Sequence, residues 1–336
     1  MKNLYLLVFY LFVVYSLQAQ ECNTYALHWD LDQNTEFITQ LDPISGEVIK
    51  LDSIPSINMV QHGFSAINPD QGIYYFHGLD DGNSGKLYSL NLHDGSIQTA
   101  VDFPPADING NLIEMHYHPF NGLLYALHWD NEEEMEYFVS INPQNGEVIK
   151  IQSLVDVHLI QMDYSALDHL NDRYYFMGID YNNDARLYTI DINTEAIIFD
   201  PLFSSNEING GVNELEVNTG RGTLYSLHYD QVESMEYFVQ INPETASITK
   251  LGSFPSIQFI QSGFSAINTL KGEYYFYGID ENGDGVFHTV NIFSGEITNS
   301  VDIYGDFNGG LKELQFPNIS PVIPKISQTA ICDTDS

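Results

Sequence analysis

Three acidic residues recur about one hundred residues apart and could bring their carboxylates together. Counting back eleven residues from a tyrosine that recurs every fifty residues reaches a glutamate in alternate copies: Glu114 and Glu214, with Glu313 added by alignment of the C-terminal segment. In the intervening copies the same count reaches an aromatic residue: Phe64, Tyr164 and Phe264. The sequence therefore predicts three carboxylates that alternate with three aromatic side chains.

This combination favours recognition of a cation or a sugar. Crowded carboxylates repel one another unless a cation or protons lie among them, and aromatic faces suit organic cations and sugar rings. The loops "DING", "EING" and "DFNG" add a second acidic set: Asp107, Glu207 and Asp306. We expect all nine residues to bind ligand. The alternative is a water-filled channel whose glutamates hydrogen-bond to neighbouring backbone.

A repeat of fifty residues positions these side chains. Aspartates mark it at six places: Asp30, Asp80, Asp130, Asp180, Asp230 and Asp280. A turn signature such as "INPQNGEVI" follows each of them. Odd and even copies differ, with "YALHWD" in the first and third and "FMGID" in the fourth. We infer that a two-copy block was tripled over roughly residues 22–318.

Each copy reads as four short strands. In residues 109–156, apolar and aromatic runs of strand length alternate with turn sequences such as "PFNG" and "NPQNG", and no helical period is visible. Four-stranded units of about fifty residues are typical of propeller blades. The fold class predicted is an all-β, six-bladed β-propeller.

The ring is predicted to close through its C-terminal strand. The first copy lacks an inner strand, whereas "NGGLKELQFPN" at 308–318 matches an inner strand that no further blade follows. This strand should complete blade one and remove an exposed sheet edge. Strand alternation places Glu114 on the same side as Leu112 and His116, which we expect to face the channel.

The turn signature also resembles the "LDxxTG" turn of quinoprotein-like and related secreted propellers. The resemblance covers all six copies and implies a propeller alone, because the tryptophan that usually follows in quinoprotein blades is missing. No cofactor residue is carried over from it. The tail "ISQTAICDTDS" resembles the opening of modules found in large exported adhesin-like proteins.

One hairpin resembles a calcium loop. "DENGDG" places Asp280, Asn282 and Asp284 at the spacing of calcium ligands, although Asn291 stands where a bidentate acid is expected. We expect either Ca²⁺ here or a polar hairpin tip. The six repeated aspartates are otherwise explained by capping of the turns that they begin.

The N-terminus has the build of a secretory signal. Lys2 precedes an apolar run, and Ala19 offers a small residue for cleavage. The predicted organisation is a signal peptide at 1–19, a propeller at 20–318 and a tail, or the start of another module, at 319–336. Export permits a disulfide between Cys22 and Cys332, which the predicted closure would bring near each other. The alternative is a Cys332 that stays free or pairs with another chain.

Composition excludes some partners and leaves two functions open. A net charge of -35 disfavours nucleic acid and anionic membranes. No blade stands out by residues that its sisters lack, which favours binding over catalysis. We therefore expect a secreted or cell-surface module that binds or scaffolds, recognising a cationic or carbohydrate ligand, or an extracellular protein partner, at the axial mouth. The alternative is a secreted carbohydrate-active hydrolase or lyase that uses the channel carboxylates.

Overall fold

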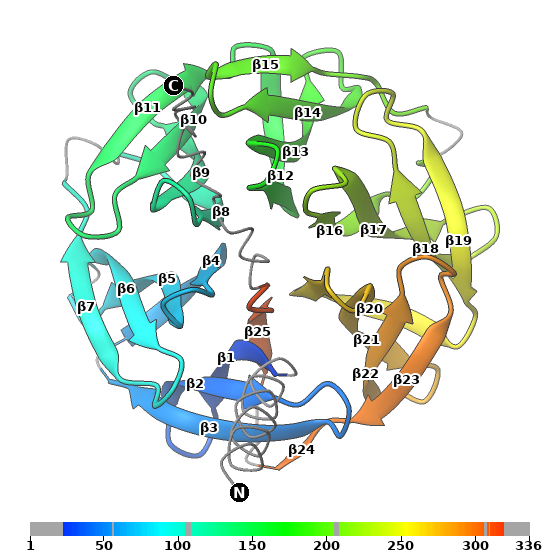
Figure 1. Ribbon diagram of the computed structural model, residues 1–336, viewed down its shortest axis with the longest axis horizontal. Coiled ribbons are helices and arrows are strands. Elements are labelled where there is room, and N and C mark those ends of the chain that lie inside the picture. Colours follow the sequence, from blue (N-terminus) through cyan, green and yellow to red (C-terminus); the bar gives the residue numbers. More distant parts are fainter. Residues whose placement is uncertain are drawn as a thin grey trace, which may run out of the picture.

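Short strands separated by tight turns form six antiparallel sheets arranged in a ring (Figure 1). The computed structural model describes residues 23–318, except for 56, 83, 105–108, 205–207, 306–307 and 309. The predicted six-bladed β-propeller with four-stranded blades is confirmed. None of the described residues forms a helix long and apolar enough to cross a membrane.

The first three blades are built in chain order from the axis outward, except that blade 1 takes its inner strand from the far end of the chain. Blade 1 contains β1 (Thr24–Asp30), β2 (Thr35–Leu41), β3 (Glu47–Ile54), β24 (Tyr304–Gly305) and the inner strand β25 (Leu311–Gln315). Blade 2 contains β4 (Ile57–Asn68), β5 (Ile73–Asp80), β6 (Gly85–Asn91) and β7 (Ile97–Asp102). Blade 3 contains β8 (Leu112–His118), β9 (Leu123–Asp130), β10 (Met135–Ile141) and β11 (Val148–Ser153).

The last three blades repeat the pattern. Blade 4 contains β12 (Val157–Asp168), β13 (Arg173–Asp180), β14 (Ala185–Asp191) and β15 (Ala196–Phe199). Blade 5 contains β16 (Val212–Asn218), β17 (Thr223–Asp230), β18 (Met235–Ile241) and β19 (Ile248–Phe254). Blade 6 contains β20 (Ile257–Asn268), β21 (Glu273–Asp280), β22 (Gly285–Asn291) and β23 (Ile297–Asp302).

The closing strand lies where the sequence predicts it. In Figure 1, β25 occupies the innermost position of blade 1 beside β1, and its register with β1 includes Tyr25 opposite Gln315. The outer edge of the same blade is covered by β24, which pairs in parallel with β3. The chain thus supplies both edges of its first blade from its last residues.

The core is divided into six clusters, each between neighbouring blades. Aromatic pairs join neighbouring blades in them: the rings of Phe138 and Tyr174 have centroids 4.9 Å apart, and those of Phe238 and Tyr274 are 5.1 Å apart. Aromatic pairs of this kind contribute beyond their buried area. Blade-to-blade packing therefore fixes the inner strands around the axis.

Several predictions lie outside the described residues. They are the signal peptide at 1–19, the tail at 319–336 and the disulfide between Cys22 and Cys332. These stay predictions.

Candidate functional site

The six repeated aspartates cap the hairpins that follow them. In each case the Oδ1 atom accepts backbone N–H groups from the turn, as Asp230 does from Val232 and Glu233 at 2.8 and 3.0 Å. In five blades a cation completes the arrangement, for example Lys250 at 2.6 Å from Asp230. These hydrogen bonds hold the pKa of Asp230 well below its usual value. The aspartates are structural, as the sequence analysis expects.

The three predicted glutamates join neighbouring blades. Each carboxylate accepts two backbone N–H groups from the inner strand of the next blade, so that Glu214 binds the amides of Gly263 and Phe264 at 2.7 and 3.1 Å. Glu114 binds the amides of 163 and 164 in the same way, and Glu313 those of 63 and 64. A tyrosine hydroxyl from the next blade donates to the main-chain oxygen of each glutamate. We call each such set a glutamate clamp.

The predicted strand alternation is wrong at the clamps. Glu114 has a positive φ of 62°, and the register of β8 against β9 shifts between Ile113 and His116. This β-bulge rotates the strand, so that Glu114, Met115 and His116 all line the axial cavity. Strict alternation does not allow for an extra residue in one strand.

The predicted aromatic half of the ring is also wrong in its placement. Phe64 and Phe264 are only 2% and 1% exposed, and both belong to the apolar clusters between blades. Tyr164 packs against a third such cluster, and its hydroxyl donates to Asn213. The bulge amides bind the clamp carboxylates and turn these rings away from the axis. Of the second acidic set, Asp107, Glu207 and Asp306 lie outside the described residues.

An axial cavity of about 70 Å³ lies between the clamps, and we call it the channel cavity. Besides the three clamp glutamates, it is lined by Asp163. Asp163 has a φ of 67° and stands at the position that Gly63 and Gly263 occupy in the sister blades. Burial, and then the charge of Asp163, raise the pKa of Glu114 to about 8 and that of Glu313 to about 7. The interior of the channel therefore favours protonated carboxyls or a nearby cation.

A second cavity, of about 100 Å³, opens next to the channel cavity at the end where the inner strands finish. We call it the axial cup. Its wall is a six-fold row of mostly apolar side chains: Ile67, Tyr117, Leu167, Val217, Ile267 and Phe316. The residues one position earlier in each inner strand form the floor of the cup. Small and polar side chains alternate there: Ala66, His116, Ala166, Glu216, Ala266 and Gln315.

The floor of the axial cup breaks the three-fold repeat. His116, Glu216 and Gln315 occupy equivalent positions, and each bonds to the equivalent serine of the next blade at 2.7, 3.2 and 3.1 Å. The position is therefore fixed by the fold, whereas its chemistry differs in each copy. Burial raises the pKa of Glu216 to about 8 and lowers that of His116 to about 4. These residues were not singled out from the sequence, although aligning the copies reveals the difference.

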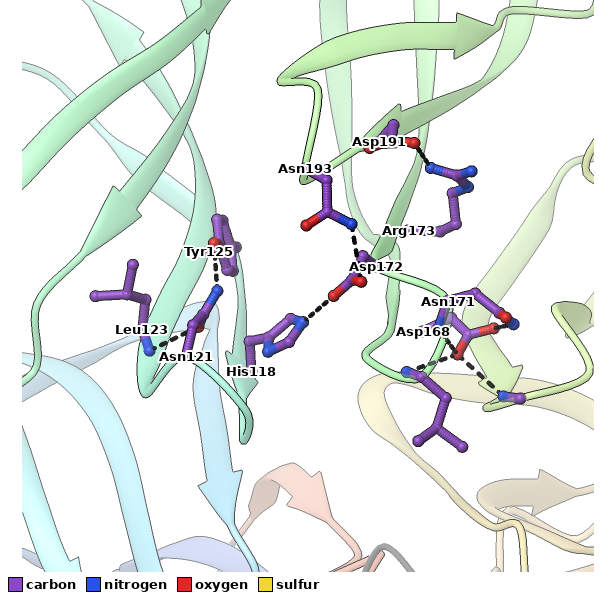
Figure 2. Close-up of polar contacts among 12 residues, drawn as sticks. His118, Asn121, Leu123, Tyr125, Asp168, Asn171, Asp172, Arg173, Asp191 and Asn193 are labelled. Atoms are coloured by element: carbon purple, nitrogen blue, oxygen red, sulfur yellow. Dashed lines mark hydrogen bonds and ion pairs between the residues drawn. The ribbon is translucent and has the colours of Figure 1, made fainter. Parts of the chain in front are cut away.

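Blade 4 also departs from its sisters, contrary to the expectation that no blade stands out. Asp172, at a φ of 53°, replaces a glycine that four other blades have at this turn. Its carboxylate accepts from His118 at 2.8 Å and from Asn193 at 2.9 Å, as Figure 2 shows. A non-glycine residue in this region is a marker of special roles. The turn of blade 4 is thereby tied to blade 3.

The predicted calcium loop forms a self-contained hairpin. Asp280 Oδ1 accepts the amides of Asn282 and Asp284 at 2.8 and 2.9 Å, and its Oδ2 accepts the side chain of Asn282. Across the part of the chain that the structure describes, no three His, Cys, Asp or Glu side chains are grouped as metal ligands. Calcium at Asp280, Asn282 and Asp284 stays a prediction.

Similarity to known proteins is confined to the fold. The chain matches no protein-family profile and no curated protein. It is similar to TolB from Acinetobacter baumannii, with a TM-score of 0.62 and 10% identity over 89% of this chain and 67% of that one. A nidogen/laminin complex matches with a TM-score of 0.59 and 9% identity over 87% of this chain and 97% of that one. An oligogalacturonate lyase in complex with manganese matches with a TM-score of 0.52 and 11% identity over 83% of this chain and 73% of that one. At these identities, the likeness establishes a shared propeller fold.

Proposed function

We propose that this chain is an exported binding module that takes the cationic head of a ligand into the axial cup. The observation that supports this role is the position of Glu216, a carboxylate on the floor of a cavity whose wall is mainly apolar. An alkylammonium group matches both features, because it stabilises the ionised form of a carboxyl whose pKa burial raises to about 8, while its methylene groups contact the wall. Ion pairs away from bulk water are stronger than those at an open surface.

A cation is favoured over a sugar at this mouth. The rings of Phe64 and Phe264 lie between blades, so they offer no exposed face on which a sugar could stack. The surplus of 35 negative charges over the whole chain also attracts cations over a distance. The cavity of about 100 Å³ suits a small head group rather than a whole oligosaccharide.

An extracellular or cell-surface setting, with a protein partner, completes the proposal. The apolar N-terminal run supports export. A nidogen/laminin complex contains a chain of similar fold, which is a precedent for a propeller of this shape in a protein complex. The cationic head would then be a lysine side chain presented by the partner.

The clamp geometry disfavours the hydrolase or lyase alternative. A catalytic carboxyl must exchange a proton with substrate. In the three clamps, both oxygens of each carboxylate already accept amide hydrogens from the next blade. These side chains hold blades together and are poorly placed for acid–base work.

The test uses the repeat itself as a control. Wild-type protein is titrated with n-butylammonium and with neutral n-butanol, and binding is followed by calorimetry. We expect binding of the amine alone and a loss of at least about tenfold in Glu216→Gln, the scale of a charged hydrogen bond. The double variant Glu216→Gln/Gln315→Glu moves the carboxylate to the equivalent position beside Ser65 and should restore binding. Equal binding by wild type and Glu216→Gln would refute the role.

A further inference from the structure

Two of the three arginines in the chain line one cavity between blades 4 and 5. This cavity, of about 500 Å³, opens beside the turns that follow β12 and β16, and we call it the blade 4–5 groove. Arg173 comes from the start of β13 and Arg221 from the turn before β17. The size falls within the range of about 300–1,000 Å³ that is usual for small-molecule sites.

An equivalent groove elsewhere in the ring lacks the arginines. The cavity between blades 1 and 2, of about 620 Å³, is formed by the same parts of the repeat. The positions of Arg173 and Arg221, three blades earlier, hold Asn23 and Gln71 there. The two arginines are therefore a property of one groove and not of the propeller scaffold.

The turns that carry the arginines are fastened to each other. Asp168 is fully buried, and its Oδ1 accepts the amide of Asn171, two residues before Arg173, at 3.3 Å. The same oxygen accepts the amide of Gly220, next to Arg221, at 3.0 Å. One carboxylate thus sets the spacing of both turns. Sites held on rigid elements lose less entropy when they bind.

Each arginine is oriented by a single neighbour. Arg173 makes an ion pair through Nη1 with Asp191 of its own blade, which Figure 2 shows. The guanidinium carbon of Arg221 lies 5.4 Å from the centre of the Phe293 ring, which belongs to blade 6 on the other side of blade 5. A guanidinium has five N–H groups, so both retain donors for a ligand. Arginine is the side chain best suited to forked recognition of a carboxylate. In a chain with so few basic residues, two arginines that line one groove indicate an anionic ligand.

The rest of the groove supplies partners for hydroxyl groups. Uncharged polar side chains line it, among them Thr189, Gln240 and Asn242, together with one carboxylate, that of the exposed Glu244. The hydroxyl of Thr189 is buried and has no hydrogen-bond partner in the described part of the chain, and the residue is only 1% exposed. Buried hydroxyls are normally satisfied. An acceptor or donor from a ligand at the groove would satisfy this one.

We propose that the blade 4–5 groove binds a carboxylated sugar. The arginines receive the carboxylate, and the amide and hydroxyl side chains receive the ring hydroxyls. An acidic peptide offers the same carboxylates, with backbone amides in place of ring hydroxyls, so it is the competing ligand that the experiment must separate from the sugar. This site is separate from the axial cup and does not depend on the function proposed there.

The experiment compares the two equivalent grooves. Wild-type protein is titrated with a glucuronic acid trisaccharide, followed by calorimetry, with an uncharged glucose trisaccharide and triglutamate as comparison probes. We expect the acidic trisaccharide to bind at millimolar concentration or better and to bind more tightly than either comparison probe. Arg173→Asn and Arg221→Gln, which copy the sister groove, should each weaken it about ten- to one-hundredfold.

Matched variants make the outcome decisive. Gln71→Ala in the sister groove and Glu216→Gln in the axial cup should leave sugar binding unchanged, and Asn23→Arg/Gln71→Arg should add a second site. The proposal is overturned if the trisaccharide does not bind the wild type, if the arginine variants bind it equally well, or if triglutamate binds as tightly. Amine binding in the axial cup would survive each of these results.

Discussion

Lys312 of the closing strand forms an ion pair with the buried Glu36 of β2, with Nζ and Oε2 3.0 Å apart. Glu36 is inaccessible to solvent, and burial raises its pKa despite the lysine. In blades 3 and 5, Ile113 and Asn213 stand at the position of Lys312, and Glu136 and Glu236 stand at the position of Glu36. Burial raises the pKa of both of these glutamates to about 7. The lysine is therefore specific to the blade that closes the ring.

Replacing Lys312 by isoleucine should make blade 1 resemble blade 3. The charged carboxylate of Glu36 would lose its partner, at a cost of about 1–3 kcal/mol at pH 8. At pH 5 the cost should be smaller, because a neutral carboxyl is less costly to bury. Urea unfolding at both pH values measures this difference. Lys86→Ile, at a more exposed pair with Asp80, serves as the control and should change stability by less than about 1 kcal/mol. An equal cost at the two pH values would contradict the prediction.

Glu214→Gln should destabilise the fold rather than only alter binding. An amide side chain has one acceptor oxygen, so one of the two N–H groups, at Gly263 or Phe264, would be left without its partner. We expect a loss of about 1–3 kcal/mol in the free energy of unfolding. Chemical denaturation measures it, with Glu244→Gln at an exposed turn as the control. A clamp variant as stable as the control would show that the clamps do not hold the blades together.

Stability should be greatest in mildly acidic solution. Burial raises the pKa of Glu114 and Glu216 to about 8 and that of Glu313 to about 7. A carboxyl with a raised folded-state pKa stabilises the protein below its unfolded pKa, and this contribution is lost as the pH rises through 7 and 8. Asp180 has the opposite shift, to about 2, so its contribution is present above pH 4 and is lost as the pH falls through 2.

The melting temperature should therefore peak between about pH 4 and 6. Thermal melts across pH 2–9 measure this curve. The Glu216→Gln variant cannot ionise at this position. It should reduce the fall in melting temperature on the alkaline side of the maximum without altering the fall on the acid side. A melting temperature that rises steadily from pH 5 to 9 would contradict the assignment of raised pKa values in the channel.

Deleting residues 308–336 should abolish cooperative folding. β1 would lose its pairing with β25, and blade 2 would lose the clamp from Glu313. An open inner edge exposes unpaired backbone and favours aggregation. Deletion of 319–336 alone is the matched control and leaves intact every strand among the residues that the structure describes. If the longer deletion melted like the shorter one, β25 would not be the strand that secures the ring.

The repeat made the fold predictable from the sequence. The direction in which side chains point at the axis could not be predicted in the same way. Six equally spaced aspartates and matching turn sequences locate the blades, and the unmatched segment at 308–318 locates the closing strand. The bulge places Glu114, a non-glycine residue, at positive φ, and the sequence of blade 3 has no glycine there to mark it. That bulge decides which side chains face the channel. Arg173 and Arg221 belong to different copies, so only the assembled ring reveals that they share a groove.

The pairing of Tyr25 with Gln315 also governs when the protein can finish folding. During synthesis, blades 2 to 6 can each form from a continuous stretch of chain, and each can pack on its predecessor as it emerges. Blade 1 must wait with an incomplete sheet until the last of these stretches has left the ribosome. Contacts so distant in sequence form slowly. The first-made blade is consequently the one longest exposed to proteases and to other chains, and its closure marks the completion of the ring.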